Sequence, residues 1–172
     1  QKERLLNVAT ILGGRMRVSA ALQSSDQQVL ANIKRSNISY GELETMGRET
    51  QRIDARADLE LILCLPGDTI SSHIQSLRDG VTSGIPTIRM HQLILLPQTE
   101  MNEPETRAKY GFKTRHRLMP RSFGRYSLFG ETFDSVETEE ICVASNTMSF
   151  EEYLECRDFD LTIEVIHNGG VF

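Results

Sequence analysis

The 172-residue sequence lacks most of the motifs that mark common functional sites. It has only three cysteines (Cys64, Cys142 and Cys156), and their wide spacing fits neither a disulfide framework nor a zinc knuckle. The four histidines are equally scattered and show no metal-ligand spacing. The chain has no glycine-rich phosphate loop and no serine or cysteine in an elbow motif. Neither a P-loop nucleotide site nor nucleophilic catalysis is therefore indicated.

The net charge and the pattern of apolar residues argue against further classes of protein. The formal net charge of −5 argues against general nucleic-acid binding by the whole chain. No apolar run approaches the roughly 18 residues of a membrane span, and the first residues show no signal-peptide pattern. With its few, separated cysteines, the chain is expected to work in the reducing cytoplasm, without membrane or nucleic-acid partners. Because it starts at Gln1, we expect a processed chain or part of a longer one.

Residues 16–110 alternate between strand and helix patterns. Strands are predicted at 16–22, 58–64 and 88–96, and a helix is predicted to follow each of them. Helix starts are indicated by Ser24–Asp26, by a capping box of Ser39 with Glu42, by Asp68 or Thr69, and by Pro104. Alternation of this kind predicts right-handed βαβ units around a parallel sheet. An earlier helix is predicted at 5–12, with Gly13–Gly14 as its stop.

The pattern changes after residue 110, so we predict an α/β unit at 1–110 and a C-terminal extension at 111–172. Residues 111–130 lack a clear period and predict a loop or an irregular hairpin, whereas 141–144 have β character. Ser149 with Glu152 predicts the start of a last helix that stops at Asn168–Gly170. The apolar residues that support this helix are Phe150, Tyr153, Leu154, Leu161 and Val165.

Seven of the 19 lysines and arginines fall within residues 107–125. They are Arg107, Lys109, Lys113, Arg115, Arg117, Arg121 and Arg125. Interleaved aromatic residues would suit an anion-binding lid, but such a segment is more often a solvated loop that balances acidic neighbours.

The stretch Asp58–Thr69 is an apolar run of strand length that stops at a Pro-Gly turn, and it predicts a strand buried on both faces. Glu60 interrupts this run, and a buried carboxylate is costly unless it is paired or bound. Gln23 ends the preceding strand and His91 lies on the next, so their side chains are expected to converge with Glu60 at one edge of the sheet. A carboxylate and an amide suit ribose hydroxyls, and Arg35 suits a carboxylate or phosphate. Structural alternatives are a helix cap for Gln23, a solvated helix-end charge for Arg35 and an ion pair for Glu60.

Taken in order, four segments resemble the second half of the radical S-adenosylmethionine (SAM) barrel. They are Leu22–Arg35, Leu59–Thr69, Gln92–Asn102 and Ser149–Leu161. The last of them is similar to the branch that also carries an N-terminal cobalamin-binding domain. The resemblance implies an α/β fold, a half TIM-type barrel of parallel βα units with a C-terminal β/helix extension. It also implies an intact enzyme that cleaves SAM reductively with a 4Fe-4S cluster, for methylation, cyclisation or rearrangement.

The resemblance gives individual residues their roles. Gln23 and Glu60 would face the SAM ribose, and Arg35 would face the methionyl carboxylate. Ile62 and the backbone near Leu93 would pack on the adenine. The family's CxxxCxxC cluster motif is absent from these residues, so the chain is expected to supply part of a SAM pocket and to be inactive in isolation.

A half-barrel leaves strand edges with unpaired backbone groups. We therefore expect the chain to cover them by homo-oligomerisation or by rearrangement of residues 111–146. Two other classes remain as alternatives. One is a non-catalytic SAM- or nucleotide-binding module, and the other is a protein-interaction domain that works through residues 107–125. The small-molecule substrate is not indicated.

Overall fold

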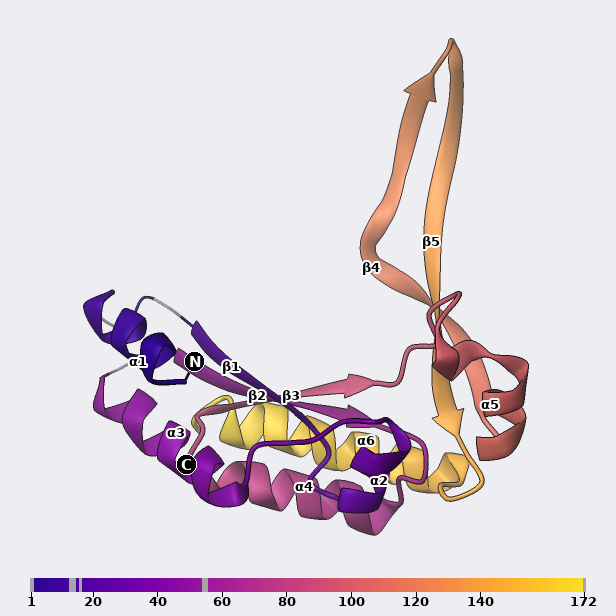
Figure 1. Ribbon diagram of the computed structural model, residues 1–172. Helices are drawn as coiled ribbons and strands as arrows, with labels where there is room; N and C mark the ends of the chain where they lie inside the picture. Colours follow the sequence, from indigo (N-terminus) through magenta and orange to yellow (C-terminus); the bar gives the residue numbers. More distant parts are fainter. Residues whose placement is uncertain (1, 13–14, 16, 54–55, 172) are drawn as a thin grey trace.

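The computed structural model describes residues 2–12, 15, 17–53 and 56–171. Its elements form a parallel sheet with helices packed on it, and a long antiparallel hairpin (Figure 1). The helices are α1 (Lys2–Ile11), α2 (Gln27–Asn32), α3 (Tyr40–Arg52), α4 (Ile70–Thr82), the 3-10 turn η1 (Glu100–Asn102), α5 (Pro104–Tyr110), α6 (Phe150–Thr162) and the π-turn η2 (Ile163–His167). The strands are β1 (Arg17–Gln23), β2 (Arg56–Leu63), β3 (Thr87–Gln92), β4 (Lys113–Leu128) and β5 (Glu131–Ala144). The predicted stop at Gly13–Gly14 and the predicted strand start at Met16 lie outside the described residues.

The predicted parallel sheet is confirmed. Its order is β1-β2-β3, and both strand pairs are parallel. The register places Ala21, Glu60 and Arg89 side by side across the three strands, and Ile62 beside His91. The antiparallel pair β4–β5 forms a separate sheet.

Local capping signals explain where the helices begin. Asp26 accepts hydrogen bonds from two backbone amides at the start of α2, and complete capping boxes open α3 at Ser39 and α6 at Ser149. Thr69 caps α4, because its hydroxyl accepts from the Ser72 amide. Asp68, the other predicted cap, has a different role that is described below.

The prediction that β2 is buried on both faces is wrong. Alternate residues Leu59, Leu61 and Leu63 have no exposed surface, and the first two belong to a core cluster shared with α3 and α4. Figure 1 shows α3, α4 and α6 on the same side of the sheet. One helical layer can cover only one face, so Glu60 and Ile62 on the other face are only partly buried.

Close contact between α4 and the sheet requires a glycine. A Cβ atom at Gly80 would lie 2.9 Å from the Ile88 side chain and 3.0 Å from the Leu59 side chain. These distances are shorter than ordinary van der Waals contact, so Gly80 lets the helix approach β2 and β3 closely. The sheet is thereby held by its helical face, and its opposite face remains open.

The predicted last helix is confirmed as α6 followed by η2, but most of the apolar residues that supported it are exposed. Only Tyr153 is buried, whereas Phe150, Leu154, Leu161 and Val165 are 39–61% exposed. The helix instead buries Tyr153, Cys156 and Asp160. Asp160 is buried because it meets a polar partner on α4, a contact that apolar periodicity does not reveal.

Of the two alternatives predicted for residues 111–130, the structure contains the irregular hairpin, with residues Lys113–Leu128 forming strand β4. β4 pairs with β5 from Lys113–Ala144 to Leu128–Glu131, interrupted between Leu118 and Phe123. Both faces of this hairpin are largely exposed, so its sequence needs no two-residue alternation. At its base, the Cys142 amide donates to the Leu93 carbonyl at 2.8 Å, which joins β5 to the end of β3. Among the described helices, none has the length and apolar character needed to cross a membrane.

Candidate functional site

The open face of the sheet carries a row of charged side chains. Asp58 is buried on this face and is surrounded by donors from both neighbouring strands. Its carboxylate accepts from the Ser19 hydroxyl at 2.7 Å and lies 2.9 Å from Arg17 Nε and 3.6 Å from Arg89 Nε. The charge of Asp58 is therefore compensated within the protein, and this carboxylate has a structural role.

Glu60 lies two residues further along the same face and has no such compensation. It is half-buried, and its carboxylate has no hydrogen-bond or ion-pair partner among the residues that the structure describes. Its neighbours in register are the methyl group of Ala21 and Arg89, and Arg89 turns its guanidinium toward Asp58. A partly desolvated carboxylate without a partner is costly, so Glu60 is available to a ligand that brings its own donors.

Two strained residues mark the carboxyl ends of adjacent strands. Gln23 at the end of β1 has φ 65°, and Cys64 directly after β2 has φ 67°. Left-handed backbone costs a non-glycine residue roughly 1–2 kcal/mol, and such strain is concentrated at functional sites. Gln23 is only 8% exposed, and its amide has no side-chain partner within the described ranges. The predicted alternative role of Gln23 as a helix cap is wrong, because Asp26 caps α2.

Arg35 lies on a segment that crosses the carboxyl ends of the strands. Asn32 donates to the Pro66 carbonyl after β2 at 2.9 Å, and Asn37 donates to the carbonyls of Leu22 and Ser24 at 2.7 Å each. Between these two anchors, the Arg35 guanidinium is exposed and pairs with none of the described residues. It is therefore positioned near the ends of β1 and β2 and is free to bind an anionic group.

The two predicted adenine-contacting residues lie at the same end of the sheet. Ile62 is half-buried on the open face, beside the exposed His91. The Leu93 side chain is buried in an apolar cluster, and its backbone amide and carbonyl are both engaged, with Leu63 and Cys142. Leu93 can therefore offer a ligand packing contacts only. The five predicted residues all lie in or beside the carboxyl half of the sheet, although Glu60 sits within β2 and not at the edge.

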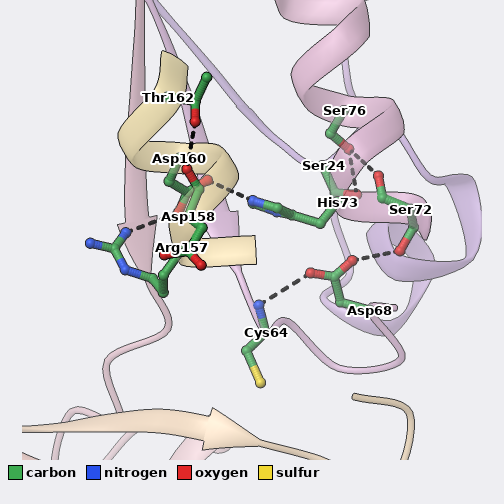
Figure 2. A network of polar contacts seen from close by, with 10 residues as sticks. All are labelled: Ser24, Cys64, Asp68, Ser72, His73, Ser76, Arg157, Asp158, Asp160 and Thr162. Atoms are coloured by element: carbon green, nitrogen blue, oxygen red, sulfur yellow. Dashed lines mark hydrogen bonds and ion pairs between the residues drawn. The ribbon is translucent and has the colours of Figure 1, made fainter. Parts of the chain in front are cut away.

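A buried polar network fixes the turn that follows β2 (Figure 2). The Asp68 carboxylate accepts from the Ser72 hydroxyl at 2.6 Å and from the backbone amides of Cys64 and Thr69 at 3.1 Å each. Burial raises the pKa of Asp68, and these hydrogen bonds oppose that rise. The network holds Cys64 in its strained conformation and so fixes the carboxyl end of β2.

The same region ties α4 to α6. His73 Nε2 lies 2.8 Å from the Asp160 carboxylate, and both side chains are 2% exposed (Figure 2). Arg157 donates to the second carboxylate oxygen at 2.9 Å. His73 lies on the buried side of α4. No signal in the sequence reveals this pair, because its members are 87 positions apart.

The cysteines do not form a metal site. The Sγ atoms of Cys64 and Cys142 lie 3.5 Å apart, and all three thiols are buried. The hydrogen bond with Cys142, together with burial, raises the pKa of the Cys64 thiol, and burial raises that of Cys156 to about 12, which disfavours the metal-binding thiolate at these two positions. Within the described ranges, no three His, Cys, Asp or Glu side chains are grouped to hold a metal ion. The donor groups present here do not fit a 4Fe-4S cluster.

Comparison with known proteins supports one class, the cobalamin-dependent radical SAM methyltransferases. No family model matches the chain. Over 159 residues it is 29% identical to the 2-(S-pantetheinyl)-carbapenam-3-carboxylate methyltransferase of Streptantibioticus cattleyicolor. Over 159 residues it is also 28% identical to the cobalamin-dependent radical SAM methyltransferase TokK of Streptomyces tokunonensis. Each match covers 90% of this chain and 22% of the relative, so the chain spans about a fifth of the length of these proteins.

Proposed function

We propose that the chain forms the SAM-facing C-terminal half of the barrel in a cobalamin-dependent radical SAM methyltransferase. The similarity over nine-tenths of the chain to two methyltransferases, one of which is a cobalamin-dependent radical SAM enzyme, supports the class. The arrangement of the sheet supports the half-barrel. In a TIM-type barrel the helices lie outside and the opposite strand face points inward, and the open face that bears Glu60 would be this inner face.

The unpartnered Glu60 carboxylate is the observation on which this proposal chiefly rests. A cis-diol brings two hydroxyl donors, and a carboxylate on the inner face can accept from both. Gln23 would add an amide donor from the end of β1, and Arg35 would bind the methionyl carboxylate in its forked geometry. Ile62 and Leu93 would supply apolar contacts for the adenine. In this proposal the chain binds and orients SAM.

The described residues are assigned no part in electron or methyl transfer. Their donor groups do not fit the 4Fe-4S cluster, and none of them is proposed to hold cobalamin. We propose that these groups belong to the remaining parts of a protein as long as the two relatives. The chain would then contribute the ribose and carboxylate contacts of a pocket that is completed elsewhere.

Isothermal titration calorimetry of the 172-residue chain with SAM tests the proposal. We expect saturable binding that weakens at least about tenfold in Glu60→Gln and in Arg35→Ala, because each change removes a charge-assisted contact. The matched controls are Glu137→Gln in the hairpin and Arg48→Ala on α3, both exposed and without described partners. They should leave the affinity unchanged. Equal binding by Glu60→Gln and wild type, or no binding by wild type, would overturn the proposal.

A further inference from the structure

The outer part of the β4–β5 hairpin, residues 118–136, is an arm that projects away from the sheet (Figure 1). Its large apolar side chains are exposed. They are Leu118, Phe123, Tyr126, Leu128, Phe129, Phe133 and Val136. An isolated two-stranded hairpin is marginally stable in water, and such exposed side chains mark an interaction site. The arm therefore needs a partner surface.

The tip of the arm carries a second sign of an interaction site. Phe129 is 101% exposed and adopts φ 52° in the two-residue turn with Gly130. A phenylalanine here combines a strained backbone with full exposure of an aromatic ring, where Asn or Gly would satisfy the turn at lower cost. A buried contact for the ring in a complex would offset both costs.

Charge is segregated across the hairpin. β4 has five Lys and Arg residues and no acidic residue, whereas β5 has five Asp and Glu residues and no Lys or Arg. Arg117 and Arg125 pair across the hairpin with Glu139 and Asp134. Arg115 and Arg121 have no partner among the described residues, so the β4 side presents uncompensated positive charge.

Helix α6 presents a complementary surface. Phe150, Leu154 and Leu161 recur at i, i+4 and i+11, so they form one exposed stripe along the helix, on the flank where the Phe150 ring stacks on that of buried Tyr153. An acidic row lies beside this stripe. Its members are Glu151, Glu155 and Asp158, which are exposed and have no side-chain partner in the described part of the chain. The surface is therefore apolar with a negative flank.

We propose that two copies of this chain exchange arms, the β4 side of each arm packing on the α6 stripe of the other copy. We assign the partner as a second copy because a single chain carries both complementary surfaces, the arm and the α6 stripe. Its own arm points away from its own α6 (Figure 1). In a two-fold symmetric dimer each arm contacts the stripe of the other copy. No arm or stripe is then left uncovered, and no further copy can be added. Arg121 of the arm then lies against the acidic row, Arg115 adds positive charge at the base of the same strand, and the apolar side chains of the arm that contact the stripe leave water.

Charge reversal tests the proposal, because the predicted contact joins a positive surface on the arm of one copy to a negative surface on α6 of the other. One variant carries Arg115→Glu and Arg121→Glu, and the other carries Glu155→Arg and Asp158→Arg. In sedimentation velocity the wild type is expected to dimerise, and each variant alone should dimerise at least about tenfold more weakly. An equimolar mixture of the two variants should recover the dimer, since both arm–helix contacts then join opposite charges.

Uncharged substitutions and a control complete the design. Phe129→Ser at the tip and Leu154→Ser on the stripe should each weaken the dimer without changing the circular dichroism spectrum, because both side chains are exposed. The control, Arg48→Glu with Arg56→Glu, reverses two exposed arginines elsewhere and should dimerise as the wild type does. A monomeric wild type, a dimer insensitive to both charge-reversal variants, or a mixture of these folded variants that stays monomeric would each overturn the proposal.

Discussion

The cluster of Arg107, Glu140 and Thr114 at the base of the hairpin predicts a specific loss of stability in acid. The Glu140 carboxylate accepts from Arg107 Nη2 at 2.5 Å, Arg107 Nη1 at 3.1 Å and the Thr114 hydroxyl at 2.5 Å. The Arg107 hydrogen bonds are the largest cause that lowers the pKa of Glu140 to about 2, and the Thr114 bond adds to it. The contact joins α5 to β4 and β5, so its loss should loosen the hairpin base.

The size of this stabilisation follows from the linkage between the protonation of Glu140 and folding. A fall of the Glu140 pKa from about 4.3 in the unfolded chain to about 2 corresponds to roughly 3 kcal/mol of stabilisation. The Glu140 side chain is 19% exposed and that of Arg107 is 30% exposed. Solvent screening at these exposures reduces the expected contribution to about 1–2 kcal/mol. Because the folded pKa is lowered, this stability is present above about pH 4.3 and is lost as the pH falls toward 2.

Urea denaturation of wild type and Glu140→Gln, followed by circular dichroism, measures this contribution. At neutral pH the variant should be less stable by about 1–2 kcal/mol, and the difference should shrink by about pH 3 because Glu140 is then protonated in the unfolded chain. Glu137→Gln is the matched control and should show no difference at either pH. The reasoning is refuted if Glu140→Gln matches wild type at neutral pH, or if the difference stays constant down to about pH 2.

Two further predictions test the packing. Asp160→Ala removes the buried acceptor of His73 and should lower the free energy of unfolding by about 2–4 kcal/mol, and a loss below about 1 kcal/mol would contradict the buried pair. Leu61→Ala, on the helix-covered face of β2, should cost about 2–5 kcal/mol, whereas Ile62→Ala, on the open face, should cost less than about 1.5 kcal/mol. Equal losses of unfolding free energy for Leu61→Ala and Ile62→Ala in urea denaturation would indicate that the sheet is covered on both faces.

Local signals predicted the helix starts and the parallel sheet well. The capping boxes at Ser39 and Ser149 connect residues only three positions apart, and the structure contains both. The predicted alternation of strands and helices also appears in the described part of residues 17–110, although β3 ends at Gln92 and not at residue 96, because each βαβ unit is specified by its own apolar pattern. The association with cobalamin-dependent radical SAM enzymes is supported at the level of the class.

The predictions that failed concerned features set by contacts between distant segments of the chain. The Leu-rich run of β2 does not reveal that its helices all lie on one side. The apolar residues of the last helix do not reveal that its buried face is built around Asp160. For residues 111–130 the sequence left a loop and an irregular hairpin as alternatives, because the pattern of one buried and one solvated face is missing from the hairpin. Gln23, Arg35, Glu60, Ile62 and Leu93 were found through the resemblance and through side-chain chemistry, and their ligand roles stay predictions.

The most direct test of the central claim asks whether Glu60 binds ribose hydroxyls. S-adenosylhomocysteine and its 2′-deoxy analogue are titrated into wild type and into Glu60→Gln. The account predicts that removal of the hydroxyl costs about 1.5–3 kcal/mol of binding free energy in wild type, as for a hydrogen bond to a charged group, and little in the variant. The same loss in both proteins, or no loss in wild type, would contradict a ribose-binding role for Glu60.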